Sequence, residues 1–121
     1  MIEKKAKQYF RGEEGYNCAQ AVAKGLEDFC AIDERLLERF ADCGCGQAEG
    51  GVCGALFAAK QLLGQSERAE EAERHFCVAA GAATCRQIKK LKRVSCHECV
   101  GLAARLAHER LAAPPQGKDL P

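Results

Sequence analysis

The nine cysteines of this 121-residue chain are the residues whose types and spacing point most directly to chemistry. Three of them directly follow a residue that caps helices, in Asn17-Cys18, Thr84-Cys85 and Ser95-Cys96. Each capping residue has Gln or Glu three positions later, which is the spacing of a capping box at the start of a helix. We therefore expect each of these cysteines to be the first residue of a helix.

A thiol at the start of a helix lies near unpaired backbone N–H groups and the positive end of the helix dipole. These stabilise the thiolate, and thiol pKa values from about 3.5 to 7.5 occur in such settings. The thiolate is the form that attacks disulfides and binds metals. Several helix starts together would also suit an anionic iron–sulfur cluster. The capped cysteines therefore predict a redox or metal site.

A fourth cysteine is also expected at the start of a helix, but without a capping side chain before it. In Gly50-Gly51-Val52-Cys53-Gly54 a glycine-rich loop runs into a helical segment. Glycines allow backbone N–H groups to approach a sulfur or an anion closely. Cys53 thus completes a set of four candidate thiolates for a metal or cluster, which are Cys18, Cys53, Cys85 and Cys96.

The order and context of these four cysteines resemble those of the C-GCAxxG-C-C family of redox-active proteins. The matching elements are Asn17 to Val22, Val52 to Leu56, Cys85 after a Phe-containing helix, and Cys96 with Val100 and Ala103-Ala104 beyond. Ala58 stands where the family motif has its second glycine. The resemblance covers roughly residues 8–110 and implies that the four cysteines are the functional set. A related segment in iron–sulfur-containing split-Soret cytochromes favours a cluster.

Three further cysteines are secondary candidates. Cys43 and Cys45 form a Cys-x-Cys in a flexible loop, which can chelate a soft metal, form a labile disulfide or resolve an oxidised thiol. Cys99 completes a CxxC with Cys96, a placement that disulfide oxidoreductases use. His97, inside that motif, is a candidate to replace a cysteine as ligand or to tune Cys96. By contrast, we expect Cys30 and Cys77 to serve packing.

Three functions remain open, and we favour the first. The four cysteines would bind a [2Fe–2S] or [4Fe–4S] cluster for electron transfer or a cluster-dependent redox role. Alternatively, the protein is a thiol–disulfide oxidoreductase or relay with Cys96 and Cys99 as catalytic residues. In that case Cys18 or Cys96 attacks, and Cys43, Cys45, Cys53 or Cys99 resolves. The third function is Zn or Cu(I) thiolate binding. Whether the protein is an enzyme is left open.

The formal net charge of +1 argues against a general nucleic-acid or membrane binder. No apolar run approaches about 18 residues, so we expect no membrane span. The start of the chain lacks the apolar core of a secretion signal, which favours the cytoplasm, where thiols stay mostly reduced. The basic run Lys89, Lys90, Lys92 and Arg93 is either a solvated face or a docking site for an acidic redox partner. A homo-oligomer that shares the cysteine site is a further option.

The amino-acid composition indicates that helices position these thiols. Ala, Leu, Glu, Lys, Arg and Gln dominate, whereas β-branched and aromatic residues are few. We predict one all-α domain over residues 1–113, a compact bundle of about five to seven short helices with its cysteines at helix N-termini. Residues 114–121 form a disordered tail. The expected helices cover residues 2–11, 18–29, 33–42, 53–63, 67–80, 85–92 and 96–112, with a glycine-rich loop over 43–51.

Overall fold

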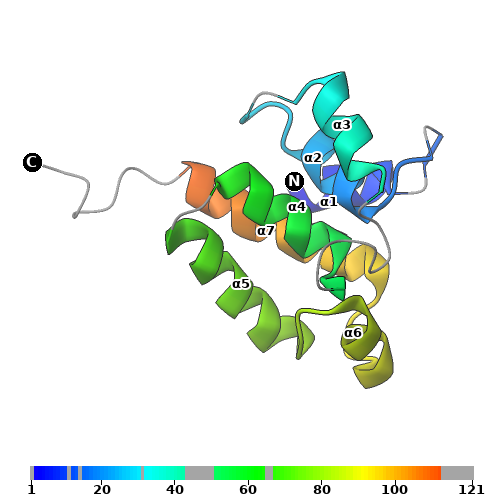
Figure 1. Ribbon diagram of the computed structural model, residues 1–121, viewed down its shortest axis with the longest axis vertical. Helices are drawn as coiled ribbons and strands as arrows, with labels where there is room; N and C mark the ends of the chain where they lie inside the picture. The colour runs from blue at the N-terminus through cyan, green and yellow to red at the C-terminus, as the bar shows by residue number, and fades with distance from the viewer. Residues whose placement is uncertain are drawn as a thin grey trace, which may run out of the picture.

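The computed structural model describes residues 2–10, 12–13, 15–30, 32–42, 51–64 and 67–112, and these ranges form helices without β-strands (Figure 1). The helices are α1 (Ile2–Tyr9), α2 (Cys18–Gly25), α3 (Glu34–Phe40), α4 (Gly54–Leu63), α5 (Glu67–Ala80), α6 (Cys85–Leu91) and α7 (Cys96–Ala112). The all-α prediction is confirmed. The loop at 43–50 and the predicted tail at 114–121 lie outside the described residues.

The long helix α7 is the centre of the bundle. It packs against α1, α2, α4 and α5, and Figure 1 shows α4 and α5 running alongside it. The shorter α3 packs on α2. No helix within the described ranges has the length and apolar character needed to cross a membrane.

Small side chains bring the helices of the core close together. Many of the buried positions are alanines, and Phe40, Phe76, Leu26 and Leu56 are the largest side chains that are fully buried. In a closely packed core, a larger side chain lowers the stability of the fold where its neighbours cannot move. The starts of α2, α4 and α7, which carry cysteines, are therefore held by a tightly packed frame.

The second helix is shorter than predicted, because α2 ends at Gly25 and the chain continues in turns to Cys30. Gly25 packs directly on α1, where a Cβ at this position would lie 2.7 Å from the Cβ of Ala6. Glycine is a poor residue for continuing a helix. Beyond Gly25, the N–H of Leu26 donates to the carbonyl of Ala23 at 3.1 Å. This bond spans three residues, as in a 3₁₀-helix, where an α-helix would span four.

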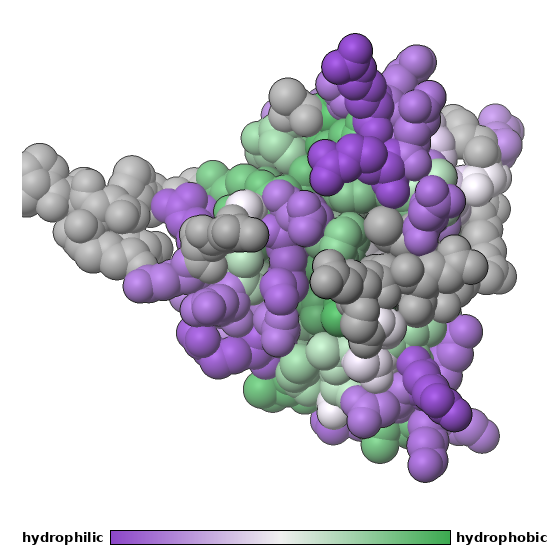
Figure 2. Space-filling view, viewed as in Figure 1, coloured by the Kyte–Doolittle hydropathy of each residue, from purple (hydrophilic) through white to green (hydrophobic). Residues whose placement is uncertain are grey.

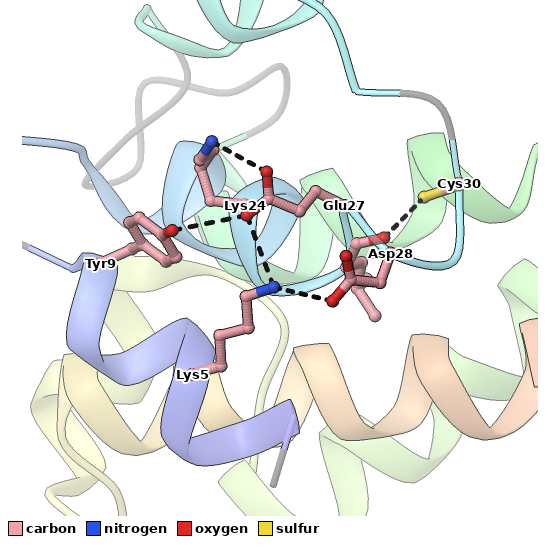
Figure 3. A network of polar contacts seen from close by, with 7 residues as sticks. Lys5, Tyr9, Lys24, Glu27, Asp28 and Cys30 are labelled. Carbon is pink, nitrogen blue, oxygen red and sulfur yellow. Dashed lines mark hydrogen bonds and ion pairs between the residues drawn. The ribbon is translucent and has the colours of Figure 1, made fainter.

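A polar network fixes α1 against the end of α2 (Figure 3). Lys5 pairs with Glu27 at 3.4 Å and with Asp28 at 3.0 Å, and Lys24 pairs with Glu27 at 3.0 Å. The hydroxyl of Tyr9 donates to Glu27 over 3.4 Å. Glu27 thus accepts from three side chains on two elements, which orients the turn that follows α2.

A candidate cysteine site

The four cysteines predicted to form one site line a single cavity of about 390 Å³. They arrive from separate elements, since Cys18, Cys85 and Cys96 are the first residues of α2, α6 and α7, and Cys53 directly precedes α4. Cys99, one turn into α7, lines the same cavity. Five sulfur-bearing side chains from four parts of the chain therefore share one space.

The start of α2 is held by a complete capping box. The side chain of Asn17 accepts from the N–H of Gln20 at 2.8 Å, and the N–H of Asn17 donates to Oε1 of Gln20 at 3.0 Å. The amide of Asn17 also donates to the carbonyls of Phe40 and Ala41, both at 2.9 Å, at the end of α3. Asn17 therefore places Cys18 and also closes the neighbouring helix.

The start of α7 is held in the same way. Ser95 Oγ accepts from the N–H of Glu98 at 3.1 Å, and the N–H of Ser95 donates to Oε1 of Glu98 at 2.9 Å. Hydrogen bonds to the carboxylate, first from the Ser95 N–H and then from the Ser95 side chain, lower the pKa of Glu98 from its usual value. The box fixes the first turn of α7, which carries both Cys96 and Cys99.

A short backbone pairing brings Cys53 next to Cys85. Val52 and Thr84 form an isolated antiparallel bridge, and the N–H of Cys53 donates to the carbonyl of Ala83 at 2.8 Å. Thr84 also caps α6, because its side chain accepts from the N–H of Gln87 at 3.4 Å. The segments that enter α4 and α6 are thus joined immediately before their cysteines.

The side chains of Cys53, which directly precedes α4, and Cys99, on α7, interact with each other. The Cys99 thiol donates a hydrogen bond to the sulfur of Cys53, and this bond lowers the pKa of Cys53 to about 7 despite burial. The sulfur of Cys53 makes no capping hydrogen bond of ordinary geometry. The N–H groups of Ala55 and Leu56 nevertheless lie close enough to lower its pKa further.

The pKa of Cys99 is raised by the same contact. Donation to Cys53 is the largest cause, and burial and electrostatic interactions with Cys53, Cys96 and Cys18 add to it. Cys99 thus interacts with three of the predicted cysteines and lines the cavity with them. From the sequence, Cys99 is only a secondary candidate for the site. The signal that favours it is its spacing of three from Cys96, which puts both side chains on one face of α7.

Part of the basic run that follows Cys85 lines the cavity. Lys89, Lys92 and Arg93 line it, whereas Lys90 does not. The spacing explains the difference, because positions 85, 88, 89 and 92 share one face of a helix. Arg93 follows in the connection to α7. The helical face that carries Cys85 therefore carries cations as well.

The remaining candidates lie elsewhere. Cys43 and Cys45 are outside the described residues. Cys30 donates to the carbonyl of Leu26 at 3.5 Å, and Cys77 is on α5; neither lines the cavity. The ring of His97 packs edge-on against Phe10, with centroids 4.9 Å apart, and His97 is not among the lining residues. In the described part of the chain, no three His, Cys, Asp or Glu side chains converge on a position for a single metal ion.

No family model, curated protein or solved structure matches the chain. The resemblance to the C-GCAxxG-C-C family therefore stays a prediction, and the function is argued from the cavity.

Proposed function

We propose that the protein binds an iron–sulfur cluster in the cysteine cavity and acts as an electron carrier or cluster-dependent redox protein. The observation that carries this proposal is the convergence of Cys18, Cys53, Cys85 and Cys96 on one cavity of about 390 Å³. Four cysteine thiolates are the usual ligands of both [2Fe–2S] and [4Fe–4S] clusters. When bound, the cluster would supply one-electron transfer.

The donor set and the cavity fit such a group. A cluster spreads its thiolate ligands over several irons, so the sulfurs need not converge on one point as they must for a single ion. The N–H groups of Ala55 and Leu56, which stabilise a negative Cys53 sulfur, would do the same for a ligating thiolate. Hydrogen bonds to cluster sulfurs raise the reduction potential.

The rest of the lining would control solvent and charge. Phe10, Ile88 and Val94 are apolar, and Phe10 and Ile88 are buried. Apolar surroundings limit access of water to a metal site. The cations Lys89 and Arg93, which also line the cavity, would offset the negative charge of a thiolate-ligated cluster.

An acidic redox partner is part of the proposal. Figure 2 shows strongly hydrophilic side chains at the end of the molecule where α6 lies, and Lys89, Lys90, Lys92 and Arg93 are exposed there. A basic surface beside a redox centre would speed the encounter with a negatively charged protein. A cytoplasmic location, where thiols stay mostly reduced, agrees with this chemistry. Cys43 and Cys45 remain secondary candidates.

Anaerobic reconstitution with ferrous iron and sulfide tests the proposal. We expect wild type to become coloured, with iron and sulfide bound in equal amounts and an EPR signal in one of its two redox states. Cys53→Ser and Cys85→Ser should lose most of the bound iron. Cys77→Ser, which removes a thiol outside the cavity, should match wild type. A colourless, iron-free wild type, or a Cys77→Ser variant as defective as Cys53→Ser, would contradict the proposal.

A further inference from the structure

We propose that, in the protein without a cluster, the same cavity reduces small organic disulfides that carry carboxylate groups, with Cys53 and Cys99 as the reacting pair. This activity does not depend on a cluster. Three observations carry it: the contact between the two sulfurs, their place in the cavity wall, and the basic residues beside them.

The two thiols interact with each other inside one cavity, as the two cysteines of an internal disulfide must. Cys53 enters α4 and Cys99 lies on α7, two helices that pack directly against each other. Their side chains are joined by a hydrogen bond between sulfurs and both line the cavity. A second thiol beside the reacting one can resolve a mixed disulfide.

The cavity suits a small molecule with negative charges. Its volume of about 390 Å³ is within the range of small-molecule sites, about 300 to 1,000 Å³. Lys89, Lys92 and Arg93 line it, and no carboxylate of the described chain pairs with any of them. Glu98 is the one acidic residue among the described residues of the lining, and it accepts the N–H of Ser95 instead. The wall therefore has more positive than negative charge.

The basic wall has a defined position. Lys92 ends α6 in the left-handed conformation, with φ 56° and ψ 27°. Arg93 lies across Gly81, where a Cβ would come within 3.1 Å of Nη1 of the guanidinium. Gly81 thus leaves the space that the arginine side chain occupies. Two residues with positive φ, Lys92 and Gly81, thus help to position these cations in the lining.

The reaction is balanced by two thiol–disulfide exchanges. The Cys53 thiolate attacks one sulfur of the substrate, the substrate S–S bond breaks, and the first organic thiolate leaves. The Cys99 thiolate then attacks the Cys53 sulfur of the mixed disulfide and releases the second organic thiolate. The protons of Cys53 and Cys99 pass to the two leaving thiolates. The substrate gains two electrons, and the protein holds one Cys53–Cys99 disulfide.

Two disulfide probes test this on the iron-free, reduced protein. One is 5,5′-dithiobis(2-nitrobenzoate), which carries two carboxylates, and the other is neutral 2,2′-dithiodipyridine. The double variant Lys89→Gln/Arg93→Gln should slow the anionic probe about tenfold, as expected for loss of local steering charges, and leave the neutral probe nearly unchanged. The control Arg86→Gln/Lys90→Gln removes two exposed cations of α6 that do not line the cavity and should have little effect on either probe.

Mass spectrometry of the products identifies the reacting pair. Wild type should yield a Cys53–Cys99 disulfide, whereas Cys99→Ser should retain the probe on Cys53. The proposal is wrong if the two double variants slow the anionic probe equally, or if the disulfide joins other cysteines. The charge test uses surface variants only, so it holds even where a cysteine variant fails to fold. A negative result here leaves cluster reconstitution unaffected, so the two proposals fail separately.

Discussion

The N–H of Cys53 donates a hydrogen bond to the carbonyl of Ala83 at 2.8 Å, and this contact joins the entrances of α4 and α6. These entrances are 30 residues apart in sequence, yet Cys53 and Cys85 line one cavity because the backbone is paired there. Capping boxes fix the starts of α2 and α7, which bring Cys18 and Cys96 to the same cavity. The site is thus assembled by backbone pairing and side-chain caps at the residues that precede each helix.

Asn17 is predicted to contribute more stability than an ordinary N-cap. Asn17→Ala loses the cap of α2 and both bonds to the end of α3, so the free energy of unfolding should fall by about 2 to 3 kcal/mol. Ser95→Ala loses only a cap and should cost about 1 kcal/mol. Urea unfolding followed by circular dichroism measures both. Equal losses would show that the bonds to Phe40 and Ala41 contribute nothing.

Gly25 and Gly101 form a matched pair for the close approach of α1. A Cβ at Gly25 would lie 2.9 Å from the Cα of Ala6, which is backbone, whereas at Gly101 the nearest atom is the flexible Cε of Lys7 at 2.6 Å. Gly25→Ala should therefore destabilise by about 1 to 3 kcal/mol through overpacking. Gly101→Ala should be neutral or stabilising by up to about 1 kcal/mol, because alanine favours the helix. Thermal unfolding of both variants distinguishes these effects.

Glu27 predicts a pH dependence of stability. Its pKa is lowered from 4.5, first by the hydrogen bond from Lys24 and then by the charges of Lys24 and Lys5. Because the folded pKa is below the unfolded one, the stabilisation is complete above the unfolded pKa and is lost as pH falls through the folded pKa. Because the Glu27 side chain is 31% exposed, the free energy of unfolding of wild type should exceed that of Glu27→Gln by less than about 1 kcal/mol at neutral pH.

The difference in stability between wild type and Glu27→Gln should disappear as the pH falls well below about 4, the usual pKa of a carboxyl group. Asp28→Asn is the control, since Asp28 is 72% exposed and, among the described residues, its one ion pair is with Lys5; its effect on stability should be smaller. Denaturant titrations at several pH values measure all three proteins. A Glu27→Gln difference that stays constant into acid would refute the assignment.

Lys92 is expected to be a strained position. It is the one residue other than glycine with positive φ in the described ranges, at 56°. Lys92→Gly should raise the free energy of unfolding by up to about 1 kcal/mol, because glycine adopts this conformation without a Cβ penalty. Lys92→Gln removes the charge and keeps the strain, so it should leave stability nearly unchanged. If both variants gain equally, repulsion among the basic residues is the cause instead.

The sequence predicts the helix starts well because capping is local. Asn17, Thr84, Ser95 and Asp33 all cap the helices expected of them, each through bonds within three residues. The end of α2 was placed wrongly because its cause, the packing of Gly25 on Ala6, joins distant parts of the chain. The contact between Cys53 and Cys99 also depends on tertiary packing. The basic wall was readable in principle from the spacing of Cys85, Lys89 and Lys92.

The most direct test of the central claim is metal and sulfide analysis of the protein isolated without oxygen from cells grown with iron. The proposal predicts iron and acid-labile sulfide in equal amounts, with both lost from Cys53→Ser and retained by Cys77→Ser. Stoichiometric zinc or copper without sulfide, or a wild-type protein with no bound metal, would contradict it.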